Sequence, residues 1–182
     1  MTNVHMLHGA GEPSPWVVRF AGLIRARGTV LDLACGAGRH ARWLAAHGYS
    51  VIALDRDAEA LKTLAGVTDI ETMCADLEDG SPWPLGPRRF AGIVVTNYLH
   101  RALFPSIIGA LEDGGILNYE TFAIGNERFG RPRNPDHLLR EGELLEVVRG
   151  HAMVIAYEHV ELPEPRPAVV QRICARRIGA AR

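Results

Sequence analysis

Residues 30–45 read VLDLACGAGRHARWLA. An apolar run that contains Asp32 is followed by a turn with Gly36 and Gly38, and the chain then continues as a basic, Ala-rich segment. This order predicts a strand, a glycine turn and a helix. Glycines in such a turn let the backbone approach a ligand closely, with helix N–H groups facing it. The stretch therefore predicts an α/β fold that holds a ligand at the turn.

The rest of the chain repeats the alternation of β-branched runs and Ala/Leu-rich segments, which is typical of βαβ units and a parallel sheet. We expect strands at 29–33, 50–55, 70–76, 90–97 and 115–122, and helices at 14–24, 38–47, 58–65 and 101–115. Ser14 is expected as the N-cap of the first helix with Pro15 in its first turn, and Pro105 indicates that the last of these helices starts near that residue. A short helix at 143–149 and two β-rich stretches at 152–160 and 168–176 follow, with 162–167 as a hairpin-like turn. Because two strands come in succession, one edge of the sheet is expected to turn antiparallel.

A chain of 182 residues fits a single domain. We divide it into an N-terminal helical segment (1–27), a cofactor-binding core (28–122), a candidate lid loop (123–142) and a C-terminal helix with strands (143–182). The first part of the loop is polar, rich in Gly and Pro, and too long for an ordinary connection.

Composition narrows the class of protein. A net charge of −1 and a pI near 6.7 give no basic footprint, so they argue against a nucleic-acid partner. The three cysteines lack Cys-x-x-Cys spacing, which argues against a disulfide framework or a zinc site. The histidines His5, His8 and His151 have no metal-ligand spacing, so no metal is expected. With no signal-peptide pattern and no long apolar run, we expect a soluble cytoplasmic protein without a membrane partner. Its oligomeric state is not predictable from these data.

Three aspartates follow or end successive predicted strands. Asp32 lies four residues before Gly36, where a carboxylate can bind or organise water around an amino group but offers nothing to a pyrophosphate. Asp55 lies 19 residues after Gly36, where an acid can accept hydrogen bonds from ribose hydroxyls. Asp76 is placed to reach an adenine amino group. Together they favour a nucleoside site along the crevice of a doubly wound sheet over three helix caps.

The segments LDLACGAGRH (31–40), ALD (53–55) and CADLEDG (74–80) resemble the successive nucleoside-binding motifs of class I S-adenosylmethionine-dependent methyltransferases. The segment YETFAIGNERFGRPRNPDHLLREGELL (119–145) resembles a bacterial subgroup close to the tellurite-resistance methyltransferases. The resemblance implies a Rossmann-like, three-layer α-β-α sandwich with a seven-stranded, mostly parallel sheet and an antiparallel edge strand. It also implies S-adenosyl-L-methionine as the cofactor. One departure is Ala91 after Phe90, where the family usually has Asp.

The resemblance also implies roles for individual residues around the cofactor. Asp32, Gly36 and Gly38 would surround its methionine part, Asp55 would bind the ribose, and Asp76 with Leu77 would flank the adenine. We add Ala34, Arg56 and Asn97 to the expected cofactor-binding residues, which are Asp32, Ala34, Gly36, Gly38, Asp55, Arg56, Asp76, Leu77 and Asn97.

Methyl transfer from a sulfonium is an in-line displacement, so the acceptor should lie beyond the ends of the fourth and fifth strands. His100 is the candidate general base because its ordinary pKa lies near neutrality; a helix-cap or solvent-facing histidine is the alternative. Tyr98 would line the methyl end of the site. Glu120 would orient the substrate, unless it is a buried structural acid.

Arg128, Arg131 and Arg133 lie in the predicted lid, where their guanidinium groups could bind an anionic substrate. The alternative is a solvated arginine-rich loop. Trp16 could pack at the same site or anchor the first helix. The function that we expect is methyl transfer to a small acceptor, which is an anionic or a soft nucleophile. The alternatives are an RNA or protein methyltransferase, an NAD(P)-binding oxidoreductase, and a cofactor-binding protein without catalysis.

Overall fold

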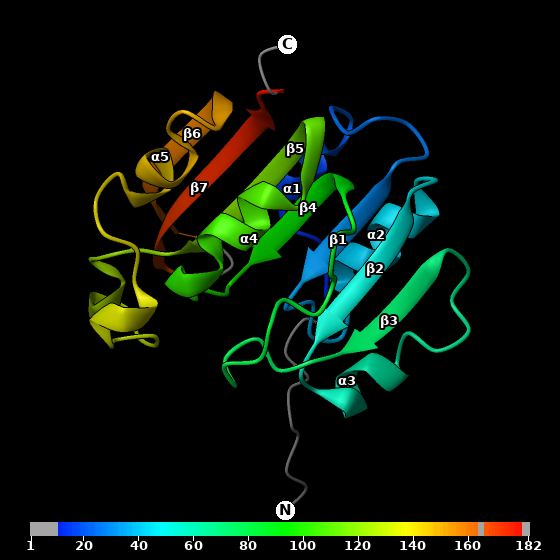
Figure 1. Cartoon of the computed structure of the whole chain (residues 1–182). Coiled ribbons are helices and arrows are strands. Elements are labelled where there is room, and N and C mark those ends of the chain that lie inside the picture. Colours follow the sequence, from blue (N-terminus) through cyan, green and yellow to red (C-terminus); the bar gives the residue numbers. More distant parts are fainter. Residues whose placement is uncertain (1–10, 164–165, 180–182) are drawn as a thin grey trace, which may run out of the picture.

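The computed structural model describes residues 11–163 and 166–179, and in these ranges seven strands form one sheet. The strands are β1 (Thr29–Leu33), β2 (Ser50–Asp55), β3 (Ile70–Cys74), β4 (Phe90–Thr96), β5 (Leu111–Phe122), β6 (Ala152–Leu162) and β7 (Ala168–Arg177). Their order across the sheet is β3-β2-β1-β4-β5-β7-β6 (Figure 1). The seven-stranded, mostly parallel sheet implied by the resemblance is confirmed.

Strands β1 to β5 run parallel, and β7 pairs antiparallel with both β5 and β6. The antiparallel strand therefore lies between β5 and the edge strand β6, at the end of the sheet where the sequence predicted a change of direction. Residues 164 and 165 of the expected turn at 162–167 lie outside the described residues. Within the described residues β6 pairs only with β7, and its ladder is irregular between Val154 and Ala156.

Helices cover both faces of the sheet, so the three-layer sandwich is confirmed. Helices α1 (Pro15–Ala21), α2 (Arg39–Ala46) and α3 (Ala58–Lys62) cover one face, and α4 (Phe104–Gly109) and α5 (Glu143–Val148) cover the other. Figure 1 shows α4 and α5 in front of the sheet and α1 and α2 behind it. The α1-side cluster includes Trp16, Val30, Leu44, Val51, Leu61 and Val94, and the α4-side cluster includes Leu31, Leu33, Ile93, Ile107, Leu144 and Val148.

The start of α1 agrees with the sequence prediction. The Ser14 hydroxyl oxygen accepts a hydrogen bond from the backbone N–H of Trp16 at 3.1 Å, and Pro15 occupies the first helical position. Such a cap satisfies one of the donors that a helix N-terminus leaves free, and proline there has no N–H to satisfy.

The expected helix at 101–115 is wrong in its extent. Residues Arg101–Leu103 form a 3₁₀ turn, α4 ends at Gly109, and β5 already begins at Leu111, which pairs with Phe90. The glycines after residue 112 therefore lie within an irregular strand rather than after a helix. Pro105 restricts the start of α4, as its fixed φ and missing N–H suit a first helical turn.

No helix in the described residues is long and apolar enough to cross a lipid bilayer.

Candidate cofactor and substrate site

The glycine turn that connects β1 to α2 follows a left-handed course. Ala34, Gly36 and Gly38 all have positive φ angles, of 56°, 55° and 76°. Gly38 is the N-cap residue of α2, and a Cβ atom built on it would lie 2.5 Å from Cδ1 of Leu64. Because that distance is far below van der Waals contact, the position requires glycine for space as well as for its backbone conformation.

Asp55 holds this turn in place from the end of β2. Its Oδ2 accepts a hydrogen bond from the backbone N–H of Gly36 at 2.6 Å, and its Oδ1 accepts one from the N–H of Asp57 at 2.9 Å. Two donated hydrogen bonds fix the orientation of the carboxylate, and each carboxylate oxygen has further lone pairs for a ligand. The sequence placed Asp55 at a ribose, and its carboxylate lies in the cavity described next.

A cavity of about 430 Å³ opens at the carboxyl ends of β1 to β4. Its volume lies within the usual range of small-molecule sites. The lining residues are Ala34, Cys35, Gly36, Arg39, Asp55, Arg56, Asp57, Ala75, Asp76, Leu77, Glu78, Thr96, Asn97 and Tyr98. Seven of the nine expected cofactor-binding residues and Tyr98 are in this set, so the structure brings most of the predicted site together.

Asp32 and Gly38 do not line the cavity. Asp32 is 1 % exposed beneath the turn, and its Oδ2 accepts a hydrogen bond from the N–H of Ala41 at 2.9 Å. Burial raises the pKa of Asp32 to about 7, although the Ala41 N–H and the charge of Arg39 act in the opposite direction. Asp32 therefore makes the kind of contact that a helix cap makes, because it accepts from a backbone N–H in the first turn of α2.

The end of β4 forms the wall of the cavity next to β5. Asn97 has a φ of 54°, and its N–H donates to the backbone oxygen of Glu120 at 2.9 Å. The Tyr119 hydroxyl donates to the backbone oxygen of Tyr98 at 2.8 Å. Burial raises the pKa of the Tyr98 phenol above its ordinary value, and the carboxylates of Glu78 and Asp76 add to this effect. The phenol is therefore neutral at physiological pH.

Glu120 lies in a partly buried polar row and does not line the cavity. Thr96, Glu120, Arg172 and Glu158 are register partners on β4, β5, β7 and β6. Glu120 accepts hydrogen bonds from the Ser14 hydroxyl at 2.8 Å and from Arg172 at 3.4 Å. Both carboxylate oxygens thus have partners within the protein, as expected if Glu120 is a structural acid.

Three other expected site residues lie away from the cavity lining. Trp16 is 2 % exposed, and the guanidinium of Arg172 lies 4.8 Å from its ring centre, so Trp16 anchors α1 within the core. His100 precedes the 3₁₀ turn at Arg101–Leu103 and caps it with no side-chain hydrogen bond. Arg128 pairs with Glu161 at 3.1 Å.

The loop at 123–142 lies at the same end of the molecule as the cavity, at the lower left of Figure 1. It contains 3₁₀ turns at Asn126–Arg128 and Pro135–His137, and Arg131 and Arg133 are exposed on it. None of its three candidate arginines lines the cavity.

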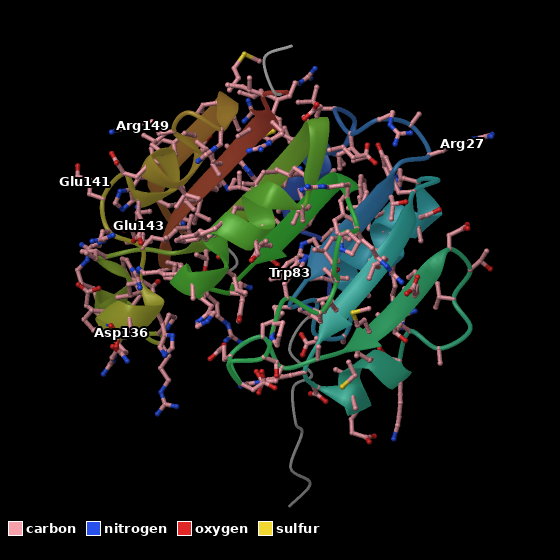
Figure 2. All side chains as sticks on the ribbon, in the orientation of Figure 1. Arg27, Trp83, Asp136, Glu141, Glu143 and Arg149 are labelled. Atoms are coloured by element: carbon pink, nitrogen blue, oxygen red, sulfur yellow. The ribbon has the colours of Figure 1, made fainter. Side chains whose placement is uncertain are left out.

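An ion-pair cluster of Arg101, Arg140 and Glu143 anchors this loop. Arg101 donates to both carboxylate oxygens of Glu143, at 2.7 and 3.0 Å, and to the backbone oxygens of Asp136 and Leu138. Figure 2 shows Glu143 and Asp136 on the side of the molecule where the loop lies. Burial alone would raise the pKa of Glu143, but hydrogen bonds from Arg101 and Arg140 hold it below its ordinary value.

Six residues of the cavity lining were missed by the sequence reasoning: Cys35, Arg39, Asp57, Ala75, Glu78 and Thr96. All six adjoin a residue that was identified, so extending each motif by one residue would have found them. Arg39, for example, is the first residue of α2 and directly follows Gly38. No group of three or more His, Cys, Asp or Glu side chains in the described ranges has the arrangement of a metal site.

Comparisons with known proteins agree with the fold. Residues 30–115 match the model of a family described as a methyltransferase domain. No curated protein sequence matches the chain.

Several solved structures share its architecture. TehB from Haemophilus influenzae is 22 % identical with a TM-score of 0.72, over 88 % of this chain and 61 % of the TehB chain. This chain thus spans about three fifths of that protein. A methyltransferase from Methanosarcina mazei, described as SAM-dependent, is 16 % identical with a TM-score of 0.69, over 92 % and 99 % of the two chains. A TehB-like, SAM-dependent methyltransferase from Corynebacterium glutamicum is 15 % identical with a TM-score of 0.66, over 92 % and 90 %.

Proposed function

We propose that this chain is an S-adenosylmethionine-dependent methyltransferase of class I, and that it methylates a small acceptor that is anionic or soft. The matching methyltransferase family model and the shared fold of SAM-dependent methyltransferases support the first part of this proposal. A carboxylate, a thiol and an oxyanion such as tellurite are acceptors of this kind. S-adenosyl-L-methionine supplies an activated methyl group when bound. The residues of the chain then have to hold the nucleophile in line, about 3–3.5 Å from the methyl carbon, and exclude water.

The observation that carries the proposal is the chemistry of the cavity at the end of β4. Thr96, Asn97 and Tyr98 form this wall, and none of them offers a free base at neutral pH. His100 does not line the described cavity. An acceptor that already carries negative charge, or loses its proton easily, reacts without a general base. The carboxylates that line the cavity come from the ends of β2 and β3 and the residues after them, so the lack of a base among Thr96, Asn97 and Tyr98 supports an anionic or soft acceptor.

The position of the cofactor is proposed from the strand ends. The fixed carboxylate of Asp55 would accept hydrogen bonds from the ribose hydroxyls, and Asp76 with Leu77 would lie at the adenine. Both acids line the cavity, on the side opposite to Thr96 in the order of the strands. The exposed Arg131 and Arg133 would attract an anion to this edge of the sheet.

Calorimetric titration with S-adenosylhomocysteine, and separately with NADH, tests the cofactor assignment. We expect micromolar binding of S-adenosylhomocysteine and none of NADH. Binding of NADH alone would identify an oxidoreductase and would overturn the proposal.

Transfer of an isotope-labelled methyl group tests the acceptor class. Carboxylates, thiols and tellurite are offered in parallel with RNA, and we expect label in the small acceptors. His100→Ala should keep its turnover within about twofold if the acceptor needs no general base, whereas a large loss of turnover with unchanged cofactor affinity would identify His100 as the base. Label in RNA alone, with binding that weakens steeply as salt is added, would indicate an RNA methyltransferase instead.

A further inference from the structure

His40, in the first turn of α2, is a buried polar residue that the proposed function has not used. It is 1 % exposed, and both of its ring nitrogens have partners. The backbone N–H of Ser14 donates to Nε2 at 3.1 Å, and Nδ1 lies 3.5 Å from the hydroxyl oxygen of Thr96. Ser14 cannot move freely, because its hydroxyl donates to Glu120 and caps α1.

These contacts determine which ring nitrogen of His40 carries the proton. A backbone N–H can only donate, so Nε2 of His40 must be unprotonated. Burial lowers the pKa of His40 to about 3, and the neighbouring charge of Arg39 lowers it further, so the ring is neutral at physiological pH. A neutral imidazole with a bare Nε2 carries its proton on Nδ1. His40 is therefore the donor toward Thr96.

The direction of these hydrogen bonds determines what Thr96 can offer to a ligand in the cavity. Since the Thr96 oxygen accepts from His40, the Thr96 hydroxyl proton is left to point to another acceptor. Thr96 lines the cavity, and so does Arg39, the neighbour of His40 in the sequence. The same cavity is thus lined by a hydroxyl donor from β4 and by a guanidinium group from α2. The acids that line the same cavity are Asp55, Asp57, Asp76 and Glu78, which come from the ends of β2 and β3 and the residues after them.

We infer that Thr96 and Arg39 form a subsite for a carboxylate or another small oxyanion, and that His40 is the positioning residue that keeps Thr96 a donor. The inference deepens the proposed function and rests on it. Two bound groups could supply the anion: the carboxylate in the methionine part of the cofactor, or the acceptor itself. A charge-assisted hydrogen bond of this kind contributes about 10- to 100-fold in affinity.

The first experiment compares Thr96→Val, which removes the hydroxyl at nearly constant shape, with Thr96→Ser, which keeps it. Each variant is titrated with S-adenosylhomocysteine and with 5′-methylthioadenosine, which lacks the amino-acid part. If the cofactor supplies the anion, Thr96→Val binds S-adenosylhomocysteine about 10- to 100-fold more weakly and 5′-methylthioadenosine normally, and Thr96→Ser resembles the wild type.

Acetate serves as the probe for the second source. If the acceptor supplies the anion, acetate binds to wild-type protein saturated with S-adenosylhomocysteine, and Thr96→Val loses this binding while its affinity for S-adenosylhomocysteine is unchanged. If neither S-adenosylhomocysteine nor acetate distinguishes Thr96→Val from the wild type, the subsite is wrong. Wild-type binding of S-adenosylhomocysteine is measured first, and its failure would overturn the proposed function instead.

The positioning role of His40 is tested separately. Glutamine can accept from Ser14 with its oxygen and donate to Thr96 with its nitrogen, so His40→Gln should bind the affected ligand within about threefold of the wild type. His40→Leu should show the same loss as Thr96→Val. The ¹⁵N chemical shifts of the His40 ring in the unmodified protein report the tautomer directly, even if His40→Leu does not fold. A proton on Nε2, or equal binding by the Gln and Leu variants, would contradict the role of His40.

Discussion

At the residue scale, the two aspartates at the carboxyl ends of β1 and β2 differ in environment. Asp32 is almost completely buried and accepts a hydrogen bond from Ala41, whereas Asp55 faces the cavity and accepts from Gly36 and Asp57. The first therefore affects mainly the stability of the fold, and the second affects mainly the binding of a ligand.

Asp32 should make the stability of the protein depend on pH. Its folded-state pKa of about 7 lies above the ordinary value of 3.8, so the folded state binds the extra proton between these values. The contribution of this group is fully present below about pH 4 and is lost as pH rises to about 7, a change on the order of 4 kcal/mol. The free energy of unfolding of wild type minus that of Asp32→Asn should fall by this amount across the range. Chemical denaturation at several pH values measures it, and a constant difference would contradict the burial of an acid with a raised pKa.

Asp55 should affect affinity more than folding. Asp55→Asn keeps an oxygen for one of the two backbone donors but removes the charge that strengthens hydrogen bonds to ribose hydroxyls. We expect the Kd for S-adenosylhomocysteine to rise about 10- to 100-fold. Asp79→Asn is the matched control, because Asp79 is exposed and does not line the cavity. Equal affinities of the two variants in calorimetry would place the ribose elsewhere.

At the element scale, the segment at 123–142 is a loop with fixed ends. Its C-terminal part is held by the ion-pair cluster of Arg101, Arg140 and Glu143, and the side chain of Gln171 donates to the backbone oxygen of Arg140. At its N-terminal part, Asn126 accepts from the N–H of Val169 on β7. Movement of this loop over the site would therefore involve the exposed middle part that carries Arg131 and Arg133.

Glu143→Gln should release this loop. The side chain of Glu143 is only 5 % exposed, and its removal leaves Arg101 without its charged partner. We expect a loss of about 2–3 kcal/mol in the free energy of unfolding and faster trypsin cleavage after Arg131 or Arg133. Glu161→Gln is the control, since its ion pair with Arg128 is exposed and should contribute less than about 1 kcal/mol. If both variants are cleaved at the wild-type rate, the cluster does not anchor the loop.

The sequence was a good guide to the elements and a poor one to their side-chain contacts. Alternating apolar runs predicted the strands because a parallel sheet is buried on both faces, and Ser14 predicted the start of α1. The extent of α4 was missed because Gly109 and Leu111 can continue a helix or begin a strand, and pairing with Phe90 decides between them. The partners of Glu120 and His40 come from segments far apart in the chain, so no local pattern identifies them.

At the scale of the whole molecule, the cavity draws its lining from the ends of four adjacent strands, so a bound ligand should stabilise the entire fold. At 100 times its Kd, a ligand that binds only the folded state adds about 2.7 kcal/mol, which corresponds to a rise of roughly 5–10 °C in Tm for a chain of this size. We expect this rise with S-adenosylhomocysteine, measured by calorimetry. Asp55→Asn at the same ligand concentration should show a smaller rise. An unchanged wild-type Tm would mean that the ligand does not prefer the folded state.

The edge strand β6 has a consequence for how copies of this protein behave at high concentration. Within the described residues, the outer side of this 11-residue strand has no partner strand, and such an edge can template the addition of another chain. The ladder is irregular at Val154–Ala156, and on the other half of the strand Glu158 and Glu161 form ion pairs with Arg172 and Arg128. A bulge and charged side chains are two of the features by which natural edge strands hinder the addition of another strand. Ion pairs that hold the sheet and the loop together thereby also protect the protein from edge-to-edge aggregation.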